Sequence, residues 1–557
     1  LSEADLTQSR LGQAILDSVI FSGATFDSVD LTDVSLVNAQ LNDLDLRGAC
    51  FDGADLSGAE LKRSLMDKAS FIRTILKRAD LSESSLIEVN FSHTDLEEAQ
   101  LVSAKLCRAR FNETRLQKSR LLNADLTGSS MIEVDLSDTD CSGVIWDEVS
   151  LKPSNLSGAI INGAPLEIIK RIPCELDRAD LSKTELNGLN LEGLTLESLT
   201  LNQSELVNAN LKEATIDSFS AYESKLDHAN LEGATLMRAK LHRSSLVEID
   251  AGGVNLKGAH LQESDLTRAH LVGADLSEAQ LARATLKEAD LTSALLNEAI
   301  LSEADLSGAI LDHITLKGVN LSHTKLNGAS FQSVDLESAN LSHAELRGAQ
   351  FSGALLNHAN LGHSNLSDAL CQRLQASGIR LQDATLERVD FSNAHLSGAK
   401  VGQAKASSSR WTDALLEGAD FSDAELAQTD FDNANLERAV LNRANLSKAS
   451  LQGSNLSQAQ LQETSLISAN LTGANLTGAN LTGADLTNAQ LVNVDLTGAL
   501  LNGLRLDDTL FSPTSLRDAS VIGLNLSALD LTSLMGIDHW SRFDASQSIL
   551  PSIPCNG

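Results

Sequence analysis

The sequence is poor in the residues that usually fill the core of a globular domain. Aromatic residues make up only 3% of the 557 residues, with 14 Phe, 3 Trp and 1 Tyr, and proline occurs six times. So little aromatic volume argues against several large round cores, although 42% of the residues are hydrophobic. The composition favours a narrow core built from Leu, Ala and Phe.

Long apolar runs are also missing. No stretch approaches the roughly 20 apolar residues that a membrane-spanning helix needs, and no signal peptide can be read. The sequence therefore predicts a cytoplasmic protein with no membrane span, and it leaves secretion as an effector open. A repeat is already running at Leu1, so we expect that an upstream region, a leader or a domain, precedes it.

Basic residues are outnumbered by acidic ones. The chain has 43 Lys and Arg against 75 Asp and Glu, which gives a formal net charge of -32 and a pI near 4.7. Such a charge opposes direct binding to nucleic acid or to an anionic membrane and favours basic partners.

Cysteine is scarce and lacks any metal-binding spacing. The six cysteines form no CxxC pair, and no Cys/His ligand pattern appears. Cys141 and Cys371 fall on the apolar position of the repeat described below, where a thiol acts as a small filler. We expect reduced thiols, and no cofactor is predicted.

The sequence does contain a strict five-residue period. Leu or Phe recurs at Leu6, Leu11, Leu16, Phe21 and Phe26, and the same register continues beyond residue 500. A small residue usually lies two positions earlier, often with Asp or Asn in between. A period of five fits neither the helical repeat of 3.6 nor the strand repeat of 2. Repetition at a fixed period indicates a solenoid.

The motif A(D/N)LxX resembles the pentapeptide-repeat family. Tandem copies occupy 469–473, 474–478 and 479–483, and the resemblance covers roughly residues 4–535. It implies an all-β fold, a right-handed quadrilateral β-helix with one pentad per side and about 20 residues per coil. At about 4.8 Å per coil, roughly 26 coils would form a single long rod of over 100 Å. We expect this β-helix over 1–535 and a cap or tail over 536–557.

In several pentads the central residue is small and the residue two positions before it is large, which reverses the usual order of sizes. The central residue shrinks to Ala221 while the residue two before it grows to Phe219. Close packing requires lost volume to be replaced nearby, so these pentads are predicted to be repacked coils. Ala404 and Ala406 lack this exchange, and the predicted compensation is Trp411 in the next pentad.

The clearest departure from the repeat lies at about 167–178. Arg171 falls on a core position that an unpaired charge cannot occupy, so we interpret the segment as a surface excursion. It is either a tolerated insertion or a loop that docks a partner, and the sequence does not decide between them. The candidate partner-binding residues are Ile168, Ile169, Lys170, Arg171 and Ile172.

The period is also lost after about residue 535. The segment 536–557 contains Trp540 and Phe543, which we predict to cap the last coil because a solenoid needs its end covered. A subunit interface is the alternative, and the oligomeric state is not predicted.

Two surface features could bind a ligand. His323, His343 and His363 are 20 residues apart, so they are expected to stack about 4.8 Å apart, as a weak candidate for a metal site or as ordinary solvated side chains. The stretch from Lys62 to Arg120 is locally basic and is either an interaction patch or a surface of paired charges.

No catalytic motif is present, neither a P-loop nor HExxH nor GxSxG. The leading hypothesis is a non-catalytic scaffold that binds a protein of unknown identity and forms part of a larger bacterial protein. The first alternative is a DNA mimic that modulates a type II topoisomerase such as gyrase, as the family resemblance and the acidity imply. The second is a secreted bacterial effector or a component of a secretion system.

Overall fold

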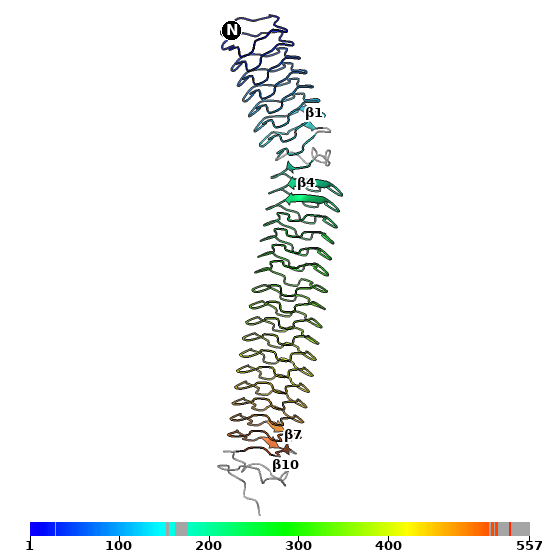
Figure 1. Cartoon of the computed structure of the whole chain (residues 1–557), viewed down its shortest axis with the longest axis vertical. Helices are drawn as coiled ribbons and strands as arrows, with labels where there is room; N and C mark the ends of the chain where they lie inside the picture. The colour runs from blue at the N-terminus through cyan, green and yellow to red at the C-terminus, as the bar shows by residue number, and fades with distance from the viewer. Residues whose placement is uncertain are drawn as a thin grey trace, which may run out of the picture. The chain divides into compact units, whose positions relative to one another are not determined.

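The computed structural model consists of two compact units, Leu1–Asp265 and Leu266–Gly557, and each is built from coils stacked on one another (Figure 1). The five-residue unit has the same conformation in both. The described residues are 1–27, 29–151, 155–161, 176–511, 514–516, 518–521 and 534–535.

Each pentad forms one side and one corner of a coil, as the pentad around Leu56 illustrates. Leu56 is fully buried and points into the coil, and the small residue Ala54 is also buried. After Leu56 the chain turns, and the amide of Ala59 donates to the carbonyl of Leu56 at 3.0 Å. The third residue of this turn, Gly58, has a φ of 68°. That is the geometry of a type II turn, which requires a positive φ at its third residue.

Consecutive coils are joined by parallel backbone pairing with a register of 20 residues. Asp55 forms a bridge with Ile75, and the amide of Leu56 donates to the carbonyl of Ile75 at 2.7 Å. The same register recurs along both units, so four pentads close one coil. The structure therefore confirms the all-β coil of about 20 residues that the resemblance implied and is consistent with four sides, while the quadrilateral form and the handedness of the winding stay predictions.

Most sides pair through a single bridge, so only ten short strands are defined within the described residues. All of the strand pairs are parallel: β1 with β2, β3 with β4 and then β5, β6 with β8, and β7 with β9 and then β10. Only β4 and β5 are six residues long; the others have two. The strands are β1 Ser130–Met131, β2 Ser150–Leu151, β3 Ala179–Asp180, β4 Thr195–Thr200, β5 Thr215–Ser220, β6 Gln490–Leu491, β7 Val494–Asp495, β8 Leu510–Phe511, β9 Thr514–Ser515 and β10 Leu534–Met535.

The core is a narrow column of stacked side chains inside each unit. Phe51, Phe71, Phe91 and Phe111 occupy the same position on four consecutive coils, with 4.8 to 5.3 Å between neighbouring ring centroids. Offset or parallel ring contacts at this distance add to the burial of apolar area. Core packing along the axis therefore follows directly from the 20-residue register.

Many buried hydroxyl groups at the small position donate to a backbone carbonyl, either of the preceding coil or of the same coil, as Ser84 Oγ does to the carbonyl of Leu81 at 2.6 Å. Thr74 Oγ1 donates to the carbonyl of Phe51 at 2.7 Å, and Thr114 Oγ1 donates to the carbonyl of Phe91 at the same distance. A buried polar group without such a partner would cost free energy. Ser and Thr can therefore replace Ala at this position.

The predicted repacking of enlarged pentads is present. Phe219 and Ala221 are both buried, so the large residue occupies the core in place of the shortened centre. Leu199, which precedes Phe219 by one coil, is buried in the same way. Among the described residues no helix is long and apolar enough to cross a membrane.

Candidate functional site

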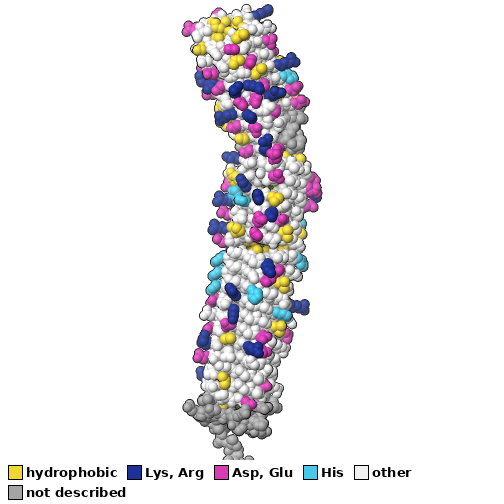
Figure 2. Space-filling model, viewed as in Figure 1, with side chains coloured by type: hydrophobic (Ala, Val, Ile, Leu, Met, Phe, Trp, Pro, Cys, Tyr) yellow, Lys and Arg dark blue, Asp and Glu magenta, His cyan; other side chains and the backbone are white. Residues whose placement is uncertain are grey.

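Exposed side chains form columns, because residues 20 apart occupy the same place on consecutive coils. Many of the charged columns contain ion pairs between neighbouring coils, such as Arg63 with Asp43 at 2.7 Å and Arg443 with Asp423 at 2.7 Å. Dark-blue and magenta side chains are accordingly interspersed over the face seen in Figure 2. Exposed pairs of this kind contribute only about 0–1 kcal/mol each, but they distribute the two signs of charge over the same surface.

His323, His343 and His363 form one such column. Their rings stack nearly parallel, with 4.8 Å between the centroids of each neighbouring pair and interplanar angles of 2° and 8°. All three side chains are exposed. Asp383 Oδ2 lies 3.9 Å from His363 Nδ1 at one end of the column, and Glu303 occupies the other end, paired with Arg283 at 2.9 Å.

This stacking does not by itself make a metal centre. Parallel rings present their faces to one another, whereas a metal needs ring nitrogens that converge on one point at about 2.0–2.1 Å. No group of three or more His, Cys, Asp or Glu residues in the described part of the chain is placed to hold a metal ion. The histidine column is thus a regular exposed surface, and its use as a metal site stays a prediction.

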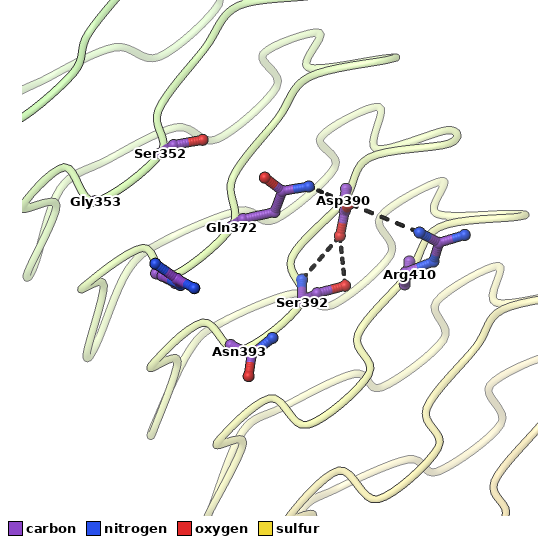
Figure 3. A pocket seen from close by; sticks show the side chains of 8 residues that line it. Ser352, Gly353, Gln372, Asp390, Ser392, Asn393 and Arg410 are labelled. Carbon is purple, nitrogen blue, oxygen red and sulfur yellow. Dashed lines mark hydrogen bonds and ion pairs between the residues drawn. The ribbon is translucent and has the colours of Figure 1, made fainter.

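A depression on the second unit is lined by residues of several consecutive coils, and its volume is about 440 Å³ (Figure 3). Asp390 lies at its centre. Its carboxylate accepts hydrogen bonds from the amide and hydroxyl of Ser392 at 3.0 and 2.6 Å and from Gln372 Nε2 at 2.7 Å. Arg410 adds an ion pair at 3.8 Å.

The environment of Asp390 favours a structural role. Partial burial alone would raise the pKa of its carboxyl, but the hydrogen bonds from Ser392 and Gln372 and the charge of Arg410 outweigh burial and lower the pKa. A general acid or base near neutral pH would instead need a raised carboxyl pKa. Asp390 therefore holds adjacent coils together as an acceptor that is charged near neutral pH.

The basic stretch from Lys62 to Arg120 is largely interleaved with acids. Lys62 pairs with Asp80 at 3.0 Å, and Lys77 contacts Glu97 at 2.8 Å. Pairing of charges therefore accounts for part of the stretch.

A second depression lies on the first unit, beside β4 and β5, and has a volume of about 610 Å³. This depression was not predicted from the sequence. A signal was available: Leu199 and Phe219 both enlarge the small position and are 20 residues apart, so the same corner is altered in two consecutive coils.

The described cysteines are all free. Burial raises the pKa of the Cys141 and Cys371 thiols far above the ordinary value, so they act as apolar fillers, as predicted. Burial also raises the pKa of Cys107, whose Sγ lies 3.3 Å from Asp125 Oδ2. A raised pKa is the opposite of what a reactive cysteine needs, so Cys107, Cys141 and Cys371 are not activated thiols.

The remaining predicted sites fall outside the described residues. These are the excursion residues Ile168, Ile169, Lys170, Arg171 and Ile172, and the capping residues Trp540 and Phe543.

Comparison with protein families shows the same repeat along most of the sequence. The family described as pentapeptide repeats matches 1–36, 26–63, 64–101, 94–131, 174–214, 222–250, 252–287, 377–410, 403–438, 419–458 and 459–498. The related pentapeptide repeat region matches 289–366. No curated protein sequence matches the chain.

Solved pentapeptide repeat structures resemble parts of the chain. HetL from the cyanobacterium Nostoc sp. strain PCC 7120, which is involved in regulating heterocyst differentiation, is 29% identical; the match covers 46% of this chain and 88% of HetL, with a TM-score of 0.18. A protein from the Arabidopsis thaliana thylakoid lumen is 29% identical over 18% of this chain and 65% of its own, with a TM-score of 0.13. Full-length QnrB1, a plasmid-mediated fluoroquinolone resistance protein, is 18% identical over 44% of this chain and 94% of its own, with a TM-score of 0.14.

Proposed function

Because this chain belongs to the pentapeptide repeat family, we propose that it is a non-catalytic scaffold that binds a protein partner through the columns of side chains on its coils. The observation that supports this proposal is the constant 20-residue register, which repeats the same side-chain position on coil after coil. A backbone fixed in this way presents side chains in a pre-organised array, which lowers the entropic cost of binding.

Within that proposal the partner remains to be identified by experiment. The net charge of -32 favours a basic surface on the partner. Single columns such as the one through His323, His343 and His363 offer stretches of uniform chemistry that a partner could follow along several coils.

DNA mimicry toward a type II topoisomerase is the alternative, and the acidity of the chain is its support. A mimic needs a face on which negative charge is continuous, as on the phosphate backbone. Columns in which cations alternate with acids, such as Glu223, Arg243 and Glu263, weigh against it, because Arg243 lies 3.7 Å from one carboxylate and 3.0 Å from the other. We therefore rank the scaffold first.

The proposal can be tested by immobilising the whole chain and identifying the proteins it retains. Each candidate is then purified and its affinity measured by surface plasmon resonance. We expect saturable binding of a purified partner, weakened by a variant in which one column is changed, for example His323, His343 and His363 to Ser. Absence of saturable binding by any retained protein contradicts the scaffold. Inhibition of gyrase supercoiling by the chain would instead establish the alternative.

A further inference from the structure

The groove beside β4 and β5 arises because two consecutive coils lack the turn that normally forms one of their corners. Residues 178 and 238 take the usual positive φ of the corner, 57° and 56°. Ser198 and Ser218 occupy the same position on the two coils between them, yet they lie within extended six-residue strands and do not take a positive φ. The chain therefore runs straight where it normally turns.

The residue that follows each straightened corner is large. Leu199 and Phe219 stand where the repeat has a small residue, and both are buried. Size alone does not remove a corner, because Leu374 is also buried at this position and follows Arg373, which keeps the usual φ of 57°. The two straightened corners lie on consecutive coils and pair with each other as β4 and β5. The consequence at the surface is a groove of about 610 Å³, which falls in the range of small-molecule sites.

Two rows of polar side chains line this groove. In one row Thr200 pairs with Ser220, Ser220 with Lys240, and Lys240 with His260, each by a parallel backbone bridge. The other row contains Ser198, Ser218 and Arg238, two residues earlier on the same coils. In both rows, hydroxyl side chains on two consecutive coils are followed by a cation on the next coil.

The two cations differ from most of their neighbours because they are unpaired. Arg238 and Lys240 are exposed, and neither forms an ion pair with another described residue. Nearby cations are paired at short distances, Lys212 with Glu232 at 2.7 Å and Lys225 with Glu205 at 2.6 Å. In a chain with a net charge of -32, two free cations beside one groove leave positive charge available to a ligand.

Three further contacts shape the site. The stem of Arg238 lies over Gly258, where an added Cβ would come within 3.2 Å of the Arg238 Cγ. Tyr222 stacks on His242 with 5.0 Å between the ring centroids and 9° between the planes, which gives the groove a flat aromatic wall. Asp217 is the one carboxylate among the lining residues of this groove, and it restricts the position of an anion to the Arg238 and Lys240 end.

We propose that this groove binds the phosphate group of a small phosphomonoester. The guanidinium of Arg238 offers paired donors that match phosphate oxygens, and the ammonium of Lys240 adds a second positive charge. The hydroxyl of Ser218 lies in the same row as Arg238 and donates to a remaining oxygen, whereas the hydroxyl of Ser220 is held by Asn202, to whose Oδ1 it donates at 2.7 Å. The organic part of the ligand lies against Tyr222. This inference is independent of the scaffold function.

The test is a titration of the whole chain with phenyl phosphate, measured by isothermal titration calorimetry. We expect R238Q/K240Q to weaken binding about tenfold or more, because charge-assisted hydrogen bonds are lost. The matched control is K118Q/R120Q, which removes the same charge from the same two positions of a regular coil and is expected to leave the affinity unchanged. Equal weakening by both double variants, or no binding to the parent chain, overturns the proposal.

A second pair of variants does not remove any cation. Ser218→Glu places a negative charge inside the groove and is expected to abolish binding, whereas Ser338→Glu introduces the same charge at the equivalent position of a regular coil and is expected to have no effect. Inorganic phosphate and acetate complete the titrations. Weaker binding of inorganic phosphate than of phenyl phosphate supports the contact with Tyr222, and acetate bound as tightly as phenyl phosphate overturns the phosphate assignment.

Discussion

The indole ring of Trp411 stacks on the ring of Phe391, with 4.3 Å between the centroids and 23° between the planes. Its other face meets Phe431 at 5.7 Å. The three residues occupy the same position on three consecutive coils, and Trp411 is fully buried. One large side chain thus holds three coils together where the neighbouring central residue is only Ala406.

Replacing Trp411 with Ala is therefore expected to destabilise the second unit by about 3–5 kcal/mol, since truncation of a buried aromatic residue leaves a cavity as well as losing apolar contacts. Urea denaturation and hydrogen exchange of the coils containing Phe391 and Phe431 measure the effect. Trp411→Phe keeps a ring in the stack and should lose less. An unchanged urea midpoint for Trp411→Ala would show that the stack contributes nothing to stability.

The indole N–H of Trp411 donates to Ser409 Oγ at 2.7 Å, and Ser409 Oγ donates to the carbonyl of Ala406. Ser409→Ala leaves the buried N–H without its acceptor and is expected to cost about 1–3 kcal/mol. A double-mutant cycle with Trp411→Phe isolates this bond, because phenylalanine has no N–H to satisfy. Additive losses in the cycle would mean that the two side chains do not depend on one another.

Acid should weaken the fold through aspartates that precede the turns. The hydroxyl of Thr127, and then its amide, donate to Asp125 and lower the carboxyl pKa below its unfolded value of about 3.9. The stabilisation from a lowered pKa is complete above the unfolded pKa and is lost as the pH falls through the folded pKa. We therefore expect the melting temperature to decrease once the pH drops below about 4.

Asparagine provides the matched substitution for this prediction. Asn470 accepts the same two bonds from Thr472, at 3.1 and 2.7 Å, without a titrating group. A variant with Asp30, Asp125 and Asp485 changed to Asn should lose less stability between pH 5 and 3 than the parent. A variant with the exposed residues Glu83, Glu133 and Glu298 changed to Gln controls for net charge, and an equal gain in acid stability for it would exclude our explanation.

Two glycines at successive corners should respond differently to alanine. Gly53 and Gly48 both have a positive φ, 74° and 68°, so alanine at either position costs about 1–2 kcal/mol. A Cβ at Gly53 would also come within 2.2 Å of Asp33 Oδ1, whereas a Cβ at Gly48 meets nothing within 4 Å. We expect Gly53→Ala to be the more destabilising in thermal denaturation. Equal melting temperatures would show that Asp33 moves away without cost.

The five-residue period was enough to predict a solenoid with a narrow core, because a single side-chain position, such as that of Leu56, decides what is buried in every pentad. The resemblance to the pentapeptide-repeat family supplied the register of 20, and with it the column of His323, His343 and His363. The fold is local and repetitive, so one correct unit determines its neighbours.

The groove at β4 and β5 was not predicted, for a physical reason. The sequence showed that Phe219 is larger than the repeat allows, and we interpreted it as repacking inside the coil. Whether a large residue is absorbed by the core or opens the backbone depends on the space beneath the turn, which a five-residue pattern does not describe. The outcome at Phe219 and Leu199 was both repacking and a lost corner.

The 20-residue register also imposes a counting rule on changes of length. Within either unit, inserting one pentad satisfies every local requirement of turn and core, yet it rotates all later residues of that unit by one side of the square. Arg443 and Asp423 would no longer face each other if the insertion fell between them, although neither residue had changed. Inserting four pentads returns every later residue to its original side. A duplication of one pentad therefore moves all later surface residues of the unit to another side of the coil. A duplication of four pentads keeps them on the same side.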